Sequence, residues 1–300
     1  MAIKTVKATI NGQTYDLTLN SASGKWEATI TAPGKTSYNL AGGYYNVSVE
    51  ATNEAGTKGS ADASTVDGLK LVVKETVAPV ITIVSPTAGA YVANSKQPVV
   101  FNITDETGGS GVDISTLVVK QDNTAVASAN ITHTAISNGY SVTYTPSAAL
   151  SDGSHTVTIN CKDHDGNAAV EKSTTYTVDT VPPTLNVTSP ADGLITAASS
   201  VTVAGTTNDA TSSPVVITIS LNGTDQGTIP VGTGGTFSKV VTLKEGNNTI
   251  IVKAKDAAGK ESSVTRTVTL DTSVPKIKAA TITPNPVDTG KTMVISVTIE

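Results

Sequence analysis

The sequence of 300 residues has little of what disulfide-stapled, helical or membrane-spanning proteins need. It holds a single cysteine, Cys161, so no internal disulfide can form. Charged residues make up only 15% and aromatic residues only 4%. No segment carries apolar residues at helical spacing over several turns, and no run approaches the roughly eighteen apolar residues of a membrane helix. We therefore expect almost no α-helix and no membrane span.

The charge distribution and the absence of known catalytic motifs exclude several classes of function. The formal net charge is −5, and Lys and Arg form no cluster, which argues against a nucleic-acid partner. The sequence has no P-loop, no G-x-S-x-G, no H-E-x-x-H and no dinucleotide fingerprint. The abundant residues are Thr, Val, Ser, Gly and Asn, which favour strands and turns. We therefore expect a β-protein that is not an enzyme.

Two kinds of phrase recur along the chain. A proline phrase occurs three times: KETVAPVITIVSPTAG from Lys74, VDTVPPTLNVTSPADG from Val178 and LDTSVPKIKAATITPNP from Leu270. Proline fixes the backbone and donates no ladder hydrogen bond, so each phrase suits the junction between the last strand of one domain and the first strand of the next. Recurrence at such spacing predicts tandem domains.

The second recurring phrase is a strand followed by a tight turn. It reads YNVSVEATNEAG, HTVTINCKDHDG and NTIIVKAKDAAG, beginning at Tyr45, His155 and Asn248. Apolar residues alternate in each copy, which predicts a strand with one inward face. Cys161 occupies the position that alanine holds in the other two copies, so we interpret it as a small buried side chain rather than a nucleophile or metal ligand.

These phrases resemble bacterial immunoglobulin-like repeats, the β-sandwich modules of bacterial surface adhesins and tailed-phage virion proteins. The A-x-D-x-x-G turn from Ala254 to Gly259, the VDTxxP junction from Val178 to Pro182 and the segment TDETGGSGVDISTLVV from Thr104 carry the resemblance. The fold expected is all-β, with tandem Ig-like β-sandwich domains that form an elongated rod. The predicted divisions are 1–76, 77–180, 181–273 and a two-strand segment, 274–300.

The two ends of the chain complement each other. The first repeat, TVKATINGQTYDL, starts at a hairpin that the third repeat reaches only at Val215, after two earlier strands. The last segment contains only two such opening strands, IKAATITP and TMVISVTIE. Either the natural chain continues, or the sequence was cut from something longer, or residues 275–300 complete the first domain of a neighbouring copy by head-to-tail strand exchange.

Four aromatic residues in the first repeat are candidates for glycan binding, which uses exposed flat rings. They are Tyr38, Tyr44, Tyr45 and Trp26. The alternative is that these rings fill the core of a domain with fewer strands.

We expect no cofactor, and calcium is the one candidate that acidic and amide residues leave open. Asp163, Asp165 and Asn167 place oxygen ligands around a glycine, although a polar hairpin turn explains the same residues. The family resemblance adds four residues as junctional calcium ligands: Asp105, Asp113, Asp179 and Asp271. The first junction departs from this pattern because Glu75 stands where the others have aspartate.

The resemblance implies a structural and adhesive role. We expect a display protein of a phage or phage-like virion, with other virion or surface subunits as partners and weak binding to host-surface or mucosal glycans. The alternatives are a bacterial cell-surface adhesin or stalk, which would be extracellular, and an accessory binding region of a larger glycan-active protein.

Overall fold

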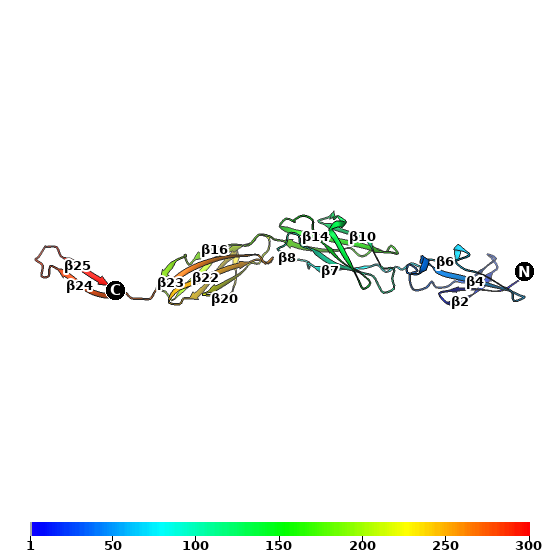
Figure 1. The fold of residues 1–300 in the computed structure, drawn as a ribbon, viewed down its shortest axis with the longest axis horizontal. Helices are drawn as coiled ribbons and strands as arrows, with labels where there is room; N and C mark the ends of the chain where they lie inside the picture. Colours follow the sequence, from blue (N-terminus) through cyan, green and yellow to red (C-terminus); the bar gives the residue numbers. More distant parts are fainter. Residues whose placement is uncertain (1) are drawn as a thin grey trace. The chain divides into compact units, whose positions relative to one another are not determined.

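The computed structural model describes residues 2–300 as strands, loops and short 3-10 turns (Figure 1). The 3-10 turns are η1 (Ala41–Gly43), η2 (Asp67–Leu69), η3 (Ser128–Asn130) and η4 (Thr233–Gly235). In this part of the chain, no helix has the length and apolar character to cross a bilayer. The predicted fold class, tandem Ig-like β-sandwich domains, is confirmed. The predicted elongated form stays a prediction.

The chain divides into two compact units, one that ends at Asp179 and one that begins at Thr180. The division by contacts falls next to one predicted boundary, and the four predicted segments stay a prediction.

The first unit begins with a six-stranded sheet in the order β3-β2-β1-β4-β5, with β6 also paired to β4. Its strands are β1 (Ile3–Ile10), β2 (Gln13–Asn20), β3 (Lys25–Glu27), β4 (Tyr45–Asn53), β5 (Lys58–Ala61) and β6 (Lys70–Leu71). The β1–β2 connection is the predicted Asn11-Gly12 turn, in which both residues have positive φ, 49° and 78°. Asn and Gly tolerate this conformation best, and it matches the twist of the flanking strands.

The rest of the first unit is a sandwich of two sheets, β11-β10-β14-β15-β8 and β12-β13-β9-β7. The strands of the first of these are β8 (Tyr91–Val92), β10 (Val112–Gln121), β11 (Thr124–Ala125), β14 (Gly153–Asp163) and β15 (Lys172–Val178). Those of the second are β7 (Val80–Ser85), β9 (Val99–Thr104), β12 (Ile131–Ile136) and β13 (Gly139–Tyr144).

The second unit repeats the arrangement with the sheets β16-β18-β21 and β17-β23-β22-β19-β20. The strands of the smaller sheet are β16 (Thr184–Ser189), β18 (Ser200–Asn208) and β21 (Thr236–Thr242). Those of the larger are β17 (Leu194–Thr196), β19 (Val216–Leu221), β20 (Thr224–Ile229), β22 (Gly246–Lys255) and β23 (Glu261–Leu270). The predicted Asn222-Gly223 turn joins β19 to β20 with φ of 52° and 79°.

The recurring strand phrase lies at the centre of each large sheet. On β14, Val157, Ile159 and Cys161 are fully buried, and β22 buries the corresponding Ile250, Val252 and Ala254. The alternation of a strand brings these side chains to one face, where they meet the opposite sheet. The small third residue predicted from the sequence therefore lies in the core, as expected.

The first sheet has a thinner core because no second sheet covers it within the described residues. The matching residues of β4, Val47, Val49 and Ala51, are only half-buried. They pair with Ile10, Ala8 and Val6 of β1, which are buried.

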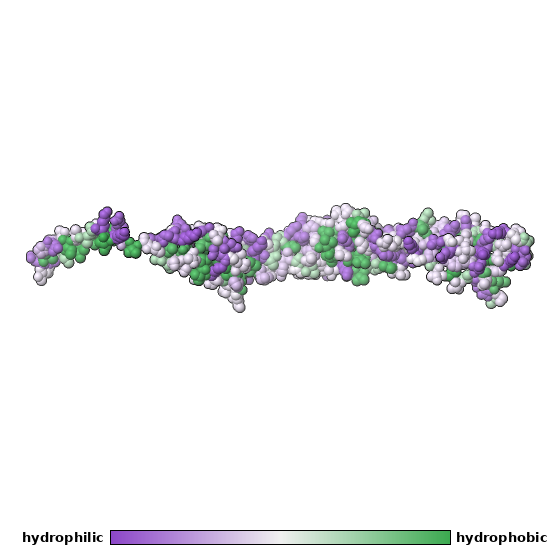
Figure 2. Space-filling view, turned by 90° about the horizontal axis from the view of Figure 1, so that it is seen from below, coloured by the Kyte–Doolittle hydropathy of each residue, from purple (hydrophilic) through white to green (hydrophobic). Residues whose placement is uncertain are grey.

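A separate hairpin, β24 (Ile277–Thr283) with β25 (Val294–Ile299), follows in the second unit. The cross-strand pairs Ile282–Ile295 and Ala280–Val297 lie on one face, whereas Thr281 and Ser296 lie on the other. All residues of both strands are exposed, and Figure 2 shows hydrophobic side chains on the surface of this hairpin. It is therefore an amphipathic hairpin whose apolar face has no partner in the described residues.

Matched substitutions at equivalent strand positions test how much each core contributes to the free energy of unfolding. We expect Val252→Ala to lower the unfolding free energy of its domain by about 2 to 3 kcal/mol, because it removes buried methyl groups and leaves a cavity. Val49→Ala, at the half-buried equivalent position, is expected to cost clearly less. Denaturant unfolding of both variants measures this, and equal losses would contradict the difference in burial.

The apolar face of the β24–β25 hairpin is expected to drive the predicted head-to-tail association. Deletion of residues 275–300 should then reduce the mass measured by light scattering to that of a single chain. Ile295→Asn on the apolar face should act like the deletion, whereas Ser296→Asn on the polar face should not. If the intact chain is already monomeric at high concentration, strand exchange is wrong.

Candidate functional site

The acidic residues of the first unit gather where the segment after β6 meets the loops after β9 and β14. Glu75 lies in the connecting segment between β6 and β7, and Asp105 and Glu106 follow β9 directly. Asp163 is the last residue of β14, and the loop after it contributes Asp165. The sequence placed these residues far apart, and the sandwich brings the ends of their strands to the same edge.

Asp163 is explained by the turn that follows β14. It is buried, and its two carboxylate oxygens accept hydrogen bonds from the backbone N–H and the side-chain amide of Asn167, at 2.8 and 2.7 Å. Asn53 and Asp256 accept the same backbone bond in the other two copies of the turn, at 2.9 and 2.8 Å. Because the neutral Asn53 does this equally, the position needs an acceptor rather than a charge.

Asp165 and Asn167 hold the connecting segment. Oδ2 of Asp165 accepts hydrogen bonds from the Thr36 hydroxyl at 2.6 Å and from the Glu75 N–H at 3.0 Å. The amide nitrogen of Asn167 donates to the Glu75 carbonyl at 3.2 Å. The predicted calcium loop of Asp163, Asp165 and Asn167 thus uses side-chain groups to fasten the backbone on either side of Glu75.

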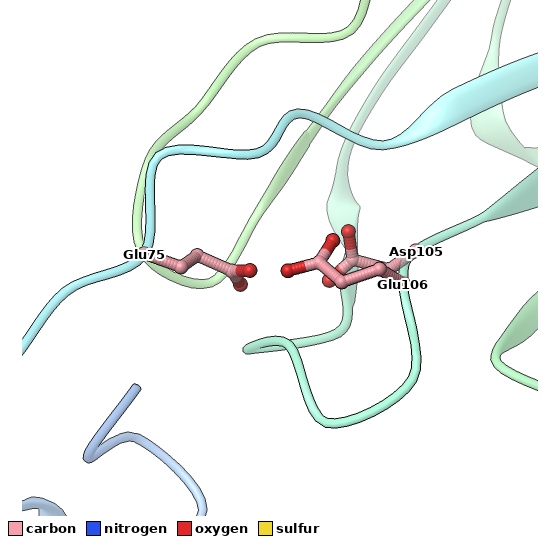
Figure 3. A group of neighbouring side chains, drawn as sticks. All are labelled: Glu75, Asp105 and Glu106. Carbon is pink, nitrogen blue, oxygen red and sulfur yellow. The ribbon is translucent and has the colours of Figure 1, made fainter. Parts of the chain in front are cut away.

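Three other carboxylates converge on one point. Glu75, Asp105 and Glu106 each offer one oxygen, and these three oxygens lie within 4.8 Å of one another. Figure 3 shows the side chain of Glu75 reaching from the connecting segment toward the two acids of the loop after β9. None of the three carboxylates forms an ion pair within residues 2–300. At an effective dielectric constant of about 20, each such pair of charges repels by roughly 3 kcal/mol, and less where Glu106 meets solvent.

The backbone of the loop after β9 shapes this cluster. The Gly111 N–H donates to Oδ2 of Asp105 at 2.7 Å, and the Ser110 N–H donates to Oε1 of Glu75. A Cβ atom on Gly109 would lie 2.7 Å from Oε1 of Glu106 and 2.8 Å from Oδ2 of Asp105. Glycine at this position therefore gives the carboxylates the room to converge.

The environment of Asp105 disfavours its charged form. Burial raises the pKa of Asp105, the hydrogen bond from Gly111 opposes this, and the neighbouring charges of Glu75, Asp163 and Asp165 raise it further. Oδ1 of Asp105 and Oε2 of Glu75 are buried without a hydrogen-bond partner. Within residues 2–300, these two oxygens therefore have neither a hydrogen-bond donor nor an ion pair.

The remaining predicted calcium ligands lie elsewhere. Asp113 accepts hydrogen bonds from the Ser115 N–H and hydroxyl, which lower its pKa, and its Oδ2 lies 4.0 Å from Nδ1 of His164. Asp179 is buried at the end of β15, and Asp271 is exposed with Ser273 as its partner. The sequence did not predict that Glu106 belongs to this group of acids, nor that the side chain of Glu75 joins it. The available signal was the shared position of Glu75, Asp179 and Asp271 in the proline phrase.

The four predicted glycan-binding rings do not form one platform. Tyr45 is buried, and its hydroxyl donates to the Lys35 carbonyl at 3.1 Å, so its ring presents no face to a ligand. Tyr44 is half-buried with the Lys70 ammonium 5.4 Å from its ring centre. Trp26 is half-buried on β3, opposite Leu19 of β2. No ring contact joins two of the four within the part of the chain described.

Tyr38 differs because it lines a cleft of about 400 Å³. It is 45% exposed and stacks on His164, with ring centres 4.5 Å apart and planes 10° apart. Asn39 is fixed beside it by a 2.6 Å hydrogen bond from its amide to the Gly109 carbonyl. The cleft is also lined by Tyr140, Asp105 and Glu106. An exposed ring, an amide and carboxylates thus meet in one hollow.

Cys161 and His155 are both sealed into the sandwich. Burial raises the pKa of the Cys161 thiol, which keeps it protonated. His155 is buried, and its ring lies 2.7 Å from Asp122 Oδ2 and 2.8 Å from the Ser151 carbonyl. Burial of the ring lowers the pKa of His155, but these two hydrogen bonds raise it by more, so it lies above the ordinary 6.5.

Family models match two parts of the chain. The model of a bacterial Ig-like domain matches residues 88–180, and the model of glucodextranase domain B matches residues 183–272. Each covers less than half of the chain. A search of the curated proteins found no match.

The solved structures that this chain resembles include fibronectin(III)-like modules of CbhA from Clostridium thermocellum, with 16% sequence identity and a TM-score of 0.42. That match covers 64% of this chain and 94% of the other. A multi-domain segment of titin has 14% identity and a TM-score of 0.41, and the match covers 88% of this chain and 85% of that segment. A structure from a 1.5-MDa bacterial ice-binding adhesin has 24% identity and a TM-score of 0.32, and the match covers 89% of this chain and 86% of that chain. Likenesses at this level say nothing of what this chain binds.

The pair of His155 and Asp122 predicts a pH-dependent stability. Because the folded pKa of His155 is raised, its contribution is fully present below pH 6.5 and is lost as the pH rises through the folded pKa. We expect His155→Asn to remove this loss above pH 6.5, since Asn248 fills the equivalent position in the other unit. Thermal melting from pH 5.5 to 9 measures it. Parallel pH profiles for the parent and the variant would contradict a titrating His155.

Proposed function

We propose that this chain, a tandem immunoglobulin-like repeat protein, is a non-enzymatic display protein that carries a weak glycan-binding surface outside a cell or on a virion. The observation that carries the proposal is the cleft between Tyr38 and the loop after β9, which joins a fixed exposed ring to polar side chains. Around it, the chain repeats one sandwich scaffold, as a spacer or display protein would.

The chemistry of the cleft suits a sugar. Aromatic faces stack on the apolar face of a pyranose ring, and amide or carboxylate groups hydrogen-bond its hydroxyls. Tyr38 supplies the exposed face, and its stacking on His164 holds the ring in place. Asn39 and Glu106 lie in the same cleft wall. The cleft is shallow and open, so we expect affinity in the millimolar range, raised by the presence of many copies on one particle or cell.

The environments of the reactive side chains support a binding rather than a catalytic role. Catalysis by cysteine or histidine needs an accessible nucleophile beside a free base. Cys161 is fully buried with a raised pKa, and both ring nitrogens of His155 have hydrogen-bond partners. These residues act as core and hairpin residues in this proposal.

We propose that the protein is attached to a phage or phage-like virion, with other virion subunits as its partners. A bacterial cell-surface adhesin is the rival. Flanking capsid or tail genes would support the virion, and a wall anchor encoded downstream would support the cell surface. The match of residues 183–272 to a domain named after glucodextranase favours a third candidate, an accessory region of a glycan-active protein. A catalytic domain encoded in the same reading frame would support it.

A substitution in the cleft tests the proposed glycan binding. We expect Tyr38→Ala to reduce retention on immobilised mucin or cell-wall glycan at least tenfold, because the stacking face is lost. Tyr91→Ala is the matched control, since Tyr91 is 38% exposed and lies on β8 outside the cleft. Glycan-array binding and column retention of the full chain measure the effect. Equal retention of the parent and both variants would show that the cleft is not the glycan site.

A further inference from the structure

We propose, building on the glycan binding proposed above, that the cleft beside Tyr38 selects uncharged glycans and rejects acidic ones, and that Glu106 sets this preference. Acidic glycans carry the carboxylate of a sialic or uronic acid, or a sulfate group. The cleft holds the exposed ring of Tyr38 and the exposed carboxylate of Glu106 in one hollow of about 400 Å³. A sugar that stacks on the ring therefore lies in a cleft with a negatively charged wall.

A short chain of contacts joins the ring to this carboxylate. Tyr38 is followed by Asn39, whose amide donates to the Gly109 carbonyl at 2.6 Å. A Cβ atom on Gly109 would lie 2.7 Å from Oε1 of Glu106, so the carboxylate lies against the loop that holds Asn39. All four residues line the same cleft. The charge of Glu106 therefore acts on a ligand bound at Tyr38.

The other acids around the cleft add to its negative potential. Asp105 lines the cleft beside Glu106. Glu75 lies behind them, and Figure 3 shows its side chain directed toward both. One oxygen of each of the three carboxylates lies within 4.8 Å of the others. Like charges placed against one class of ligand are a common source of specificity, because they weaken the wrong complex without any new contact to the right one.

The cations near the cleft do not offset this potential. Among the described residues, no lysine or arginine lines the cleft. His164 does line it, but its Nδ1 lies 4.0 Å from Oδ2 of Asp113, which would meet a positive charge on the ring. A Cβ atom on Gly108 would lie 4.0 Å from Cε of Lys35, yet Lys35 forms no ion pair within residues 2–300. An anionic sugar therefore finds no paired cation in the cleft wall.

Hydrogen bonding selects in the same direction as charge. Asp105 is only 7% exposed, and its Oδ1 has no hydrogen-bond partner in the described part of the chain. An ionised carboxylate such as that of Glu106 only accepts hydrogen bonds. The hydroxyl and amide groups of an uncharged sugar supply donors to such oxygens, whereas a carboxylate or sulfate group supplies further acceptors. Both effects therefore favour a neutral hexose or an N-acetylated amino sugar.

The test compares one mucin immobilised on two columns, one untreated and one stripped of sialic acid by a sialidase. The full chain is applied near neutral pH in the presence of a chelator, so that no divalent cation masks the carboxylates. We expect retention to be about fivefold stronger on the stripped mucin, the size of effect that like charges produce in an open cleft. Salt at about 1 M should reduce this ratio, because it screens the repulsion. Equal retention on both columns at low salt would overturn the preference.

Variants assign the preference to one side chain. We expect Glu106→Gln to lower the ratio below about twofold, because glutamine keeps the shape of the side chain and removes its charge. Glu171→Gln is the matched control, since Glu171 is an exposed acid just before β15, outside the cleft, and it should leave the ratio unchanged. Glu106→Gln is expected to fold, because its side chain is exposed, and thermal melting checks this. A folded Glu106→Gln with the parent ratio would show that Glu106 does not set the preference.

Tyr38→Ala separates a failure of the preference from a failure of the proposed glycan binding. If the parent binds both columns equally and Tyr38→Ala binds neither, the cleft binds glycans without regard to charge, and only the preference is wrong. If the parent binds neither column, the proposed glycan binding is wrong and the preference with it. Loss of both proposals therefore has a different signature from loss of the second alone.

Discussion

The packing of two sheets across one layer of alternating apolar side chains is the constraint on which the rest of the structure depends. The central strands β14 and β22 each bury three alternate apolar residues completely, and the third of these is small, Cys161 or Ala254. A larger side chain there would push the sheets apart, since interiors are packed without spare volume. β14 ends at Asp163 and β22 at Lys255, shortly after these small residues. The polar turn that follows each strand therefore leaves its sandwich at the equivalent edge.

That fixed exit explains why the acidic residues collect at one end of a sandwich. The turn after β14 folds back so that the Asp163 carboxylate accepts the Asn167 N–H, and Asp165 accepts the Glu75 N–H of the connecting segment. The loop after β9 leaves the same edge and brings Asp105. The gathering of these carboxylates at one junction is thus a consequence of sandwich geometry.

The first sheet shows what happens when one layer is absent. Val49 and Ala51 follow the same pattern as their equivalents on β14 and β22, but they stay half-buried because no sheet within residues 2–300 lies across from them. The β24–β25 hairpin shows the converse, an apolar face with Ile282 and Ile295 exposed. Within the described residues, neither has the facing sheet that the strands of residues 80–178 and 184–270 possess.

The sequence alone determined the fold class, the tandem repetition, the Asn11-Gly12 and Asn222-Gly223 turns and the burial of Cys161, because alternation and turn chemistry are local properties of the chain. Only the tertiary structure decided which acids meet. Glu75 looked like a departure from the junction pattern and Glu106 carried no signal, yet both converge on Asp105, whereas Asp113 pairs with His164. The burial of His155 and the stacking of Tyr38 were likewise invisible in the sequence. These outcomes depend on contacts between residues distant in the chain, which only the packing of the sheets and their loops specifies.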